Sequence, residues 1–177
     1  IEEAFQKIHE ISLHLSHTIE DFRNFFKTDS KETIFDLSET IRESLKIVEA
    51  NLKVHHIQII TDLVPTTIIG QENNLKQAFI NIINNAKDAL ISESFDHITK
   101  PKLLFIHLKH RKNFTEVVFL DNAGGIPSGI MEKIFEPYFT TKHKSQGTGI
   151  GLYMTKQIIE KQSNGMIKVE NKIFQHE

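Results

Sequence analysis

Four polar side chains that could bind a metal ion stand close together in the stretch NIINNAKDAL. Asn81 and Asn85 are four residues apart, so on a helix their amides project from the same face, with Asn84 and Asp88 nearby. Amide oxygens are suitable ligands for Mg²⁺, which usually keeps water and phosphate oxygens in its other positions. Taken alone, the stretch fits a solvated helix face equally well, so a metal site needs support from elsewhere in the chain.

An aspartate followed by small residues marks a second candidate site in VVFLDNAGGIP. Asp121 ends an apolar run, and a carboxylate at a strand end can accept a hydrogen bond from an exocyclic amine such as that of adenine. Ala123, Gly124 and Gly125 would let a flat ring approach the backbone. Taken alone, an Asp-Asn turn with glycine at positive φ explains this stretch better.

Three glycines at alternate positions, Gly147, Gly149 and Gly151, come directly before an amphipathic run. Backbone N–H groups at the start of a helix lack partners and favour anions, and glycine lets phosphate oxygens lie against the chain. The spacing matches neither a P-loop nor the dinucleotide-binding fingerprint. A flexible surface loop is the alternative. Three residues just upstream stand on a loop that could close over a nucleotide: Lys142, His143 and Lys144.

Composition limits the classes of function. The chain has 177 residues, 39% of them hydrophobic and 25% charged, which is enough for one core with an added element rather than two full domains. A formal net charge of -2 argues against nucleic acid as a partner. With no cysteine, disulfides and thiolate metal sites are excluded. The longest apolar runs are too short to span a bilayer and no signal peptide is visible, so an intracellular, soluble chain is expected.

Hydrophobic periodicity predicts the elements that would position these residues. Residues 1–27 predict a long amphipathic helix with an apolar heptad seam, and the polar stretch KTDSKET after it predicts a linker over 28–33. In residues 34–177, strands are predicted over 34–37, 57–63, 66–70, 102–110, 114–121 and 165–171. Helices are predicted over 38–52 with Ser38 as the cap, 71–94, 128–135 and 149–162, and a loop of lid length over 136–148. The predicted fold class is α+β: a two-layer sandwich of a mixed, mostly antiparallel sheet with helices on one face, preceded by the long helix.

The order of these stretches resembles the ATP-binding domain of two-component sensor histidine kinases. By this resemblance NIINNAKDA is the N box, DNAGGI the G1 box, IFEPYFTTK the F box and GTGIGL the G2 box, and the likeness runs over roughly residues 33–173. The fold implied is the ATP-binding sandwich shared with gyrase, the 90-kDa heat-shock chaperone and the mismatch-repair ATPases. The cofactors implied are ATP and Mg²⁺.

The resemblance also implies roles for individual residues. Asn85 would hold Mg²⁺, Asn81 would lie near the phosphates, and Asp121 would bond the adenine amino group. Asn85, Asn81 and Lys142 would be the catalytic residues. The other residues implied to line the nucleotide site are Asp88, Ala123, Gly125, Ile126, Phe139, Thr140, Thr141, Gly147, Thr148, Gly149, Gly151 and Leu152. Ala123 departs from the family, which has glycine at this position, and the chain stops at NKIFQHE, before the final strand usual in the family.

The type of reaction depends on the residue one helical turn before Asn85. Hydrolytic relatives carry a glutamate there to activate water, whereas this chain has Asn81, whose amide cannot act as a general base at neutral pH. This favours transfer of the phosphoryl group to a positioned nucleophile over attack by water, and the resemblance implies that the nucleophile is a histidine. The alternatives are a hydrolysing ATPase, a nucleotide-binding module that has lost catalysis, and a serine kinase of the anti-sigma type.

The phosphoacceptor histidine is expected outside this sequence. His9 is followed by glutamate but lacks the arginine and Pro-Leu that follow the acceptor in the family, so residues 1–27 resemble instead the second helix of the dimerisation hairpin. The partners implied are the missing hairpin helix with its histidine, a response regulator, and a second copy in a homodimer of the whole protein. The resemblance implies a cytoplasmic domain and leaves open whether the whole protein is anchored in the inner membrane.

Overall fold

The computed structural model describes residues 31–92, 101–142 and 147–173, together with Ser12. The helix predicted over 1–27, apart from Ser12, and residues 28–30 of the predicted linker therefore lie outside the described residues. The strands are β1 (Thr33–Asp36), β2 (Ile57–Leu63), β3 (Thr67–Gly70), β4 (Lys102–His110) and β5 (Thr115–Asp121). The helices are α2 (Leu37–Val54), α3 (Glu72–Leu90) and α4 (Gly151–Gln157), with 3-10 turns η1 (Ser128–Ile130) and η2 (Lys133–Phe135) and a π-helical turn η3 (Ile158–Gln162). Among the helices that the structure describes, none combines the length and apolar character that a membrane crossing requires.

The strands form a mixed arrangement with β4 at its centre. β2 pairs with β4 in parallel, from Ile57 opposite Lys102 onward, and β5 pairs with β4 antiparallel, with Asp121 opposite Leu104. β1 and β3 form a separate antiparallel pair. The antiparallel pairing of the strands predicted over 102–110 and 114–121 is thus confirmed, and Asp121 lies at the end of β5 that adjoins the start of β4.

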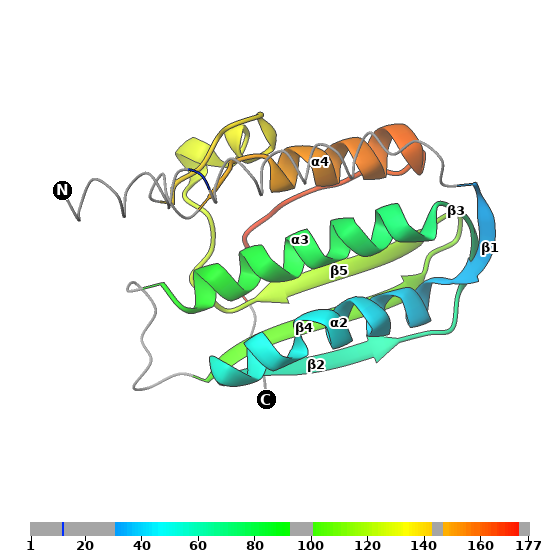
Figure 1. The fold of residues 1–177 in the computed structure, drawn as a ribbon, viewed down its shortest axis with the longest axis horizontal. Coiled ribbons are helices and arrows are strands. Elements are labelled where there is room, and N and C mark those ends of the chain that lie inside the picture. Colours follow the sequence, from blue (N-terminus) through cyan, green and yellow to red (C-terminus); the bar gives the residue numbers. More distant parts are fainter. Residues whose placement is uncertain (1–11, 13–30, 93–100, 143–146, 174–177) are drawn as a thin grey trace.

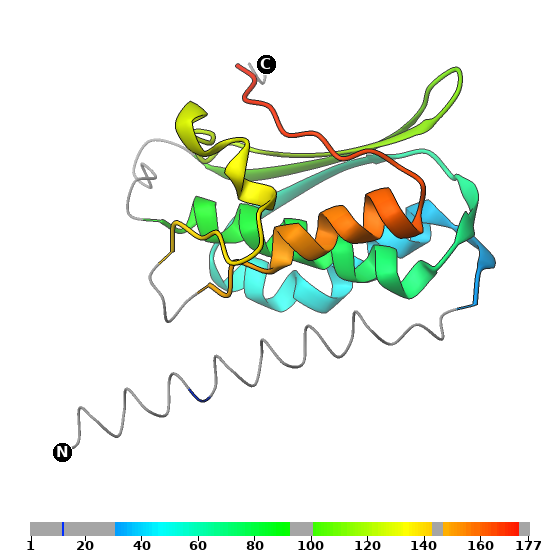
Figure 2. The ribbon, with the colours of Figure 1, turned by 90° about the horizontal axis from the view of Figure 1, so that it is seen from above.

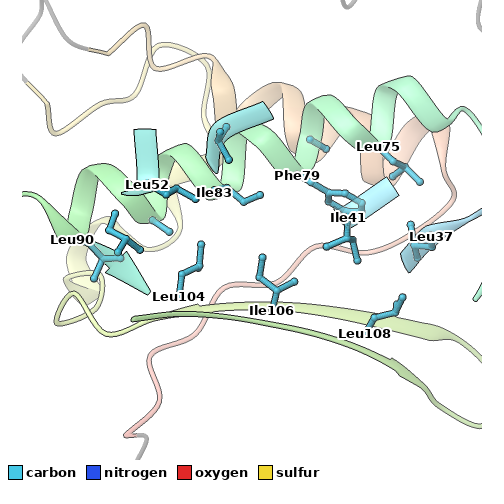
Figure 3. Packing of buried hydrophobic residues seen from close by; sticks show 14 of the residues in the cluster. Leu37, Ile41, Leu52, Leu75, Phe79, Ile83, Leu90, Leu104, Ile106 and Leu108 are labelled. Atoms are coloured by element: carbon cyan, nitrogen blue, oxygen red, sulfur yellow. The ribbon is translucent and has the colours of Figure 1, made fainter. Parts of the chain in front are cut away.

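The helices cover one face of the three-stranded sheet, as predicted, and the core lies between the two layers (Figure 2). Along β4 every second residue, Leu104, Ile106 and Leu108, is fully buried and points at the helices (Figure 3). From the helix side, Ile41 of α2 and Ile83 of α3 meet them. Because α3 packs between α2 and α4 on one face of the sheet, the side of α3 that faces away from the core is left to contact α4 and the loop before it.

The start of α2 corrects one prediction. Asp36, not Ser38, is the cap: its Oδ1 accepts hydrogen bonds from the N–H of Ser38 at 2.8 Å and from the N–H of Thr66 at 3.2 Å. Ser38 lies inside the first turn and is buried, with its hydroxyl oxygen accepting from Arg42 at 3.0 Å. The carboxylate caps the helix because β1 holds Asp36 in an extended conformation, which a cap residue needs.

The segment after η3 corrects a second prediction. The strand predicted over 165–171 does not form within the described residues, where no strand follows η3. Covered and exposed side chains do alternate in this segment, since Ile167 and Val169 are half-buried while Met166 and Lys168 are exposed. Alternation marks one covered side of an extended chain, and a strand also needs a hydrogen-bonded neighbour.

Two predicted helices also differ in kind. Residues 128–135 form two separate 3-10 turns rather than one helix, and Pro127 and Gly129, both poor helix residues, stand at the start of that stretch. The helix predicted over 149–162 begins at Gly151 and ends in the π-helical turn η3. The loop predicted between these helices is present in its described part, residues 136–142 and 147–148.

Candidate functional site

The polar face of α3 points toward α4 and the loop before it. Asn81 donates a hydrogen bond from its Nδ2 to the carbonyl oxygen of Gly151 at 3.4 Å. One turn later, the Oδ1 of Asn85 accepts from the Nζ of Lys142 at 3.3 Å. Both asparagines are half-buried, while Ile83 and Ala86 on the opposite side of α3 are in the core. The helix therefore presents the two amides on one face, as their spacing predicts.

Lys142 is bound to α3. In addition to Asn85, its ammonium contacts Asp88 Oδ2 at 2.6 Å, and Asp88 Oδ1 in turn lies 3.2 Å from the Nζ of Lys87. The Asp88 carboxylate is thus shared between two lysines. The loop before α4 is fastened to the last two turns of α3 by a cation that could instead contact a ligand.

The loop around Lys142 is folded back closely on itself. Gly149 has φ of +66°, and a Cβ on it would stand 2.4 Å from the carbonyl carbon of Tyr138. Tyr138 itself has a positive φ of +66°. A Cβ on Gly147 would lie 2.9 Å from the Oγ1 of Thr140, which already accepts from the N–H of Lys142 at 3.1 Å. The glycines permit two arms of the loop, 138–142 and 147–149, to touch.

The first residues of α4 complete this side of the site. The hydroxyl oxygen of Thr148 accepts from the N–H of Ile150 at 3.3 Å, and Thr155 donates to the carbonyl oxygen of Gly151 at 2.9 Å. Ile150 is buried and Leu152 half-buried. Around the nearby arm, Phe139 and Thr140 are half-buried and Thr141 is exposed. His143 and Lys144 lie outside the described residues.

Asp121 is the last residue of β5, and its hydrogen bond is made within the loop that follows the strand. Its Oδ1 accepts a hydrogen bond from the N–H of Ala123 at 3.0 Å. Burial raises the pKa of the Asp121 carboxyl above its ordinary value, and the Ala123 N–H opposes part of that rise. Ala123 packs against the core, so its methyl group takes part in the structure at a position where the family has glycine. Phe119, two residues before Asp121, contacts Phe79 of α3 with ring centroids 5.6 Å apart, which links this strand to the helix.

The loop after Asp121 is held by two asparagines for which the sequence predicted no role. Asn122 accepts from the N–H of Leu103 at 2.9 Å and donates to the carbonyl oxygen of Pro101 at 2.8 Å. Asn171 accepts from the N–H of Ile126 at 2.9 Å and donates to its carbonyl oxygen at 2.7 Å. No spacing or periodicity in the sequence indicates that residues 45 positions apart would meet in this way.

The side-chain oxygens of this site suit a Mg²⁺ ion that is bound together with a ligand better than a metal ion that is coordinated by the protein alone. In the ranges that the structure describes, no group of three or more His, Cys, Asp and Glu residues could hold a metal. A metal here would rely on few protein oxygens and on oxygens of its ligand, which is how Mg²⁺ usually binds with nucleotides. The Oδ1 of Asn85 is already turned toward a cation, the ammonium of Lys142.

An amide-bearing helix, an acidic strand end and a glycine-rich lid beside a mixed sheet define a nucleotide-binding domain of the sandwich type. Residues 70–175 match the family described as histidine kinase-, DNA gyrase B-, and HSP90-like ATPase, and the chain belongs to this family. It is similar to the two-component sensor PprA of Pseudomonas aeruginosa, with 31% identity over 128 residues that cover 71% of this chain and 14% of that protein. It is similar to sporulation kinase A of Bacillus subtilis, with 32% identity over 138 residues that cover 77% of this chain and 21% of that protein.

Solved structures agree in fold. The catalytic domain of the histidine kinase ThkA in a nucleotide-free form is 29% identical, with a TM-score of 0.69 over 81% of this chain and 89% of that one. ThkA in complex with the response regulator TrrA matches 92% of this chain and 46% of that one, with a TM-score of 0.70 at 24% identity. The chain spans about a fifth or less of the length of PprA and of sporulation kinase A.

Proposed function

We propose that this chain is the catalytic domain of a sensor histidine kinase, which binds Mg-ATP and transfers the γ-phosphoryl group to a histidine outside this sequence. The observation that carries the proposal is the residue one turn before Asn85. Asn81 stands there with its amide bonded to the Gly151 carbonyl, and an amide has no basic lone pair with which to activate water. The site then has to deliver phosphate to a nucleophile brought from elsewhere.

Each part of the site has a role in this proposal. Asn85 would hold Mg²⁺ through Oδ1, and the metal, when bound, would neutralise charge on the phosphates. Asn81 and the backbone of residues 147–151 would lie along the triphosphate. Asp121 would accept a hydrogen bond from the adenine amino group, with Ala123, Gly125 and Ile126 beside the ring. This follows the order of the residues along the chain and the chemistry of each group.

The lid would act through Lys142. Its ammonium now contacts Asn85 and Asp88 on α3, so binding of nucleotide and metal would require it to move. A triphosphate carries several negative charges, so it can compete for the ammonium with the single, partly exposed carboxylate of Asp88. The lysine would move from α3 to the triphosphate, with Phe139, Thr140 and Thr141 following as the lid closes.

The partners belong to the same proposal. The acceptor histidine would come from the missing helix of a dimerisation hairpin, whose second helix would be residues 1–27, in a homodimer of the whole protein. A response-regulator aspartate would receive the phosphate next. Support comes from the sensor kinases among the relatives and from the response regulator bound by ThkA.

The test begins with a calorimetric titration of Mg-ATP. We expect the unmodified chain to bind, and Asn85→Ala to weaken binding at least tenfold, because it removes the proposed metal ligand. Asn84→Ala is the matched control: it changes the neighbouring asparagine, which projects from a different side of α3. Equal affinities of Asn85→Ala and the unmodified chain would contradict the metal assignment.

The second stage tests transfer. A separate hairpin protein that carries the first helix and its histidine is added with γ-labelled ATP, and label is followed on both proteins and in free phosphate. We expect label on the hairpin histidine and little free phosphate. Rapid release of phosphate without transfer would identify a hydrolase instead, and binding without either reaction would identify a module that has lost catalysis.

A further inference from the structure

We propose that Asn171 is a positioning residue for the nucleotide: its amide holds the loop after β5 in the conformation that presents Asp121 to the base. The inference rests on the proposed function, because it takes Asp121 as the base-binding group. It adds a residue from the end of the chain, outside the four sequence boxes, to the machinery that binds the ligand.

The contact joins two distant parts of the chain. After η3 the chain turns back along the molecule (Figures 1 and 2), and Asn171 reaches the loop that follows Asp121. There its amide makes both possible hydrogen bonds to one residue: Oδ1 accepts from the Ile126 N–H at 2.9 Å and Nδ2 donates to the Ile126 carbonyl at 2.7 Å. Two bonds to one residue fix both the position and the orientation of the loop, as a strand neighbour would.

The loop needs such a support because of its composition. Gly124 and Gly125 have φ of +98° and +86°, a region that glycine enters readily but leaves just as readily. Gly125 also allows the approach itself, since a Cβ there would stand 2.6 Å from the Oδ1 of Asn171. A loop that is ordered before the ligand arrives loses less entropy on binding, so the support contributes to affinity.

The loop is anchored at its other end as well. Asn122 bonds Leu103 and Pro101, at the start of β4. Between the two asparagine contacts lie Ala123 and the two glycines, which form the floor proposed for the adenine ring. Asn122 fixes the loop where it leaves β5, and Asn171 fixes it at Ile126, shortly before η1.

The position of this contact makes its effect separable from that of the lid. The contacts of Asn81, Asn85 and Lys142 join α3 to α4 and the lid, at the end of the site proposed for the phosphates. Asn171 bonds Ile126 instead. Loss of the Asn171 amide should therefore weaken binding of the base and leave binding of the phosphates unchanged.

The experiment compares the two ends of the ligand in the full 177-residue chain. Adenosine, Mg-ATP and magnesium tripolyphosphate are titrated against the unmodified chain, Asn171→Ala and Asn171→Asp. We expect the affinity for adenosine and Mg-ATP to fall about fivefold to tenfold in both variants, which is the range for one or two lost hydrogen bonds. The tripolyphosphate affinity should stay within about twofold. Lys168→Ala, at an exposed position in the same segment, is the control and should bind all three like the unmodified chain.

Asn171→Asp sharpens the test, because its carboxylate keeps an acceptor for the Ile126 N–H and lacks the donor for the Ile126 carbonyl. Acidification protonates that carboxyl and restores a donor. The affinity of this variant for adenosine, divided by that of Asn171→Ala at the same pH, should therefore rise as the pH falls. A contact that only held the chain end together would not give this ratio a pH dependence.

Three outcomes would overturn the inference. One is an unchanged adenosine affinity in Asn171→Ala, and another is an equal loss for adenosine and tripolyphosphate, which would mean general damage. If Asn171→Ala does not fold, Asn171→Asp at pH 7 gives the same test, since its carboxylate lacks the donor for the Ile126 carbonyl; an unchanged adenosine affinity there would equally count against the role. Absence of binding by the unmodified chain would overturn the proposed function itself and this inference with it.

Discussion

The ammonium of Lys142 contacts the same amide oxygen that Asn85 would offer to a metal ion, and it is held there mainly by Asp88. Both lysine and carboxylate are about one-third exposed, so the pair is of the partly screened kind that contributes about 0.2–1 kcal/mol. A contact of this strength can hold the lid against α3 and still be replaced by a ligand. Asp88 and a phosphate group should therefore compete for the ammonium of Lys142, and this competition can be tested.

Removing the competitor should favour the nucleotide. Asp88→Asn weakens the hold on Lys142, and we expect Mg-ATP to bind up to about fivefold more tightly, the factor that corresponds to such an ion pair. Lys142→Met should weaken binding about tenfold, because the phosphates lose a charged partner. Isothermal titration measures both. In the double variant the gain from Asp88→Asn should vanish; a gain that persists without the lysine would contradict the competition.

Asp121 should show a conflict between stability and binding. Because burial raises its pKa in the folded chain, the folded state binds the proton more tightly than the unfolded state, whose carboxyl titrates at the ordinary value for aspartate. Its contribution to stability is therefore full below that value and is lost as the pH rises through the raised pKa. We expect Asp121→Asn to make the ligand-free chain more stable at pH 7, by a margin that shrinks as the pH falls toward 4. Urea unfolding at several pH values measures this margin.

The same variant should bind nucleotide less well. The introduced amide would keep an oxygen for the Ala123 N–H and would turn an N–H₂ group toward the adenine amine, so that two donors face each other. We expect the affinity for adenosine to fall about tenfold or more at pH 7. A variant that is less stable at neutral pH, or that binds adenosine normally, would contradict the assigned position of the carboxyl.

At the scale of elements, the two arms of the lid cross at Gly149. A Cβ there meets the backbone of Tyr138 at 2.4 Å, and its φ of +66° disfavours any other residue. We expect Gly149→Ala to lower the free energy of unfolding by about 1–3 kcal/mol and to weaken Mg-ATP binding, because the lid base must shift. Gly129→Ala is the matched control, since a Cβ there meets nothing within 4 Å and its φ is ordinary. Equal melting temperatures of the two variants would show that the crossing is not rigid.

Elements with a strong internal pattern could be predicted from the sequence. The strand over 57–63 and the pairing of 102–110 with 114–121 are confirmed because alternation and length defined them. The cap of α2 was assigned to the wrong residue because Asp36 and Ser38 are both good cap residues, and the choice depends on Thr66, far along the chain. The strand over 165–171 was wrong because alternation does not say whether a pairing partner exists.

Part of the candidate site could also be predicted from the sequence, because that part depends on a local pattern. The spacing of Asn81 and Asn85 defines a shared helix face without any tertiary information, and the structure has that face. The roles of the site residues in binding nucleotide stay predictions. The contacts of Lys142 with Asp88 and of Asn171 with Ile126 join segments 54 and 45 residues apart, and no local pattern encodes such pairs.

At the scale of the whole molecule, ligand and metal should stabilise the fold by mass action. Mg-ATP at about one hundred times its dissociation constant should add about 2.7 kcal/mol to the free energy of unfolding, seen as a rise in melting temperature. Excess EDTA should remove most of that rise, because the metal links Asn85 to the phosphates in the proposed site. In Asn85→Ala the melting temperature without ligand should be nearly unchanged, since the amide is half-buried on the polar face of α3, and the rise should be small. A full rise in the presence of EDTA would contradict a role for the metal.

Effects on folding and effects on ligand binding should be separable along the central helix α3. Its inner side, with Leu75, Phe79, Ile83 and Leu90, completes the core, and its outer side holds the amides and Asp88. A library of single substitutions along this helix, sorted once for folded protein and once for captured nucleotide, should therefore yield two classes of intolerant positions. Each class would recur every three to four residues, and the two would be out of phase by about half a turn. The phase difference alone would locate the ligand relative to the sheet, without a bound structure.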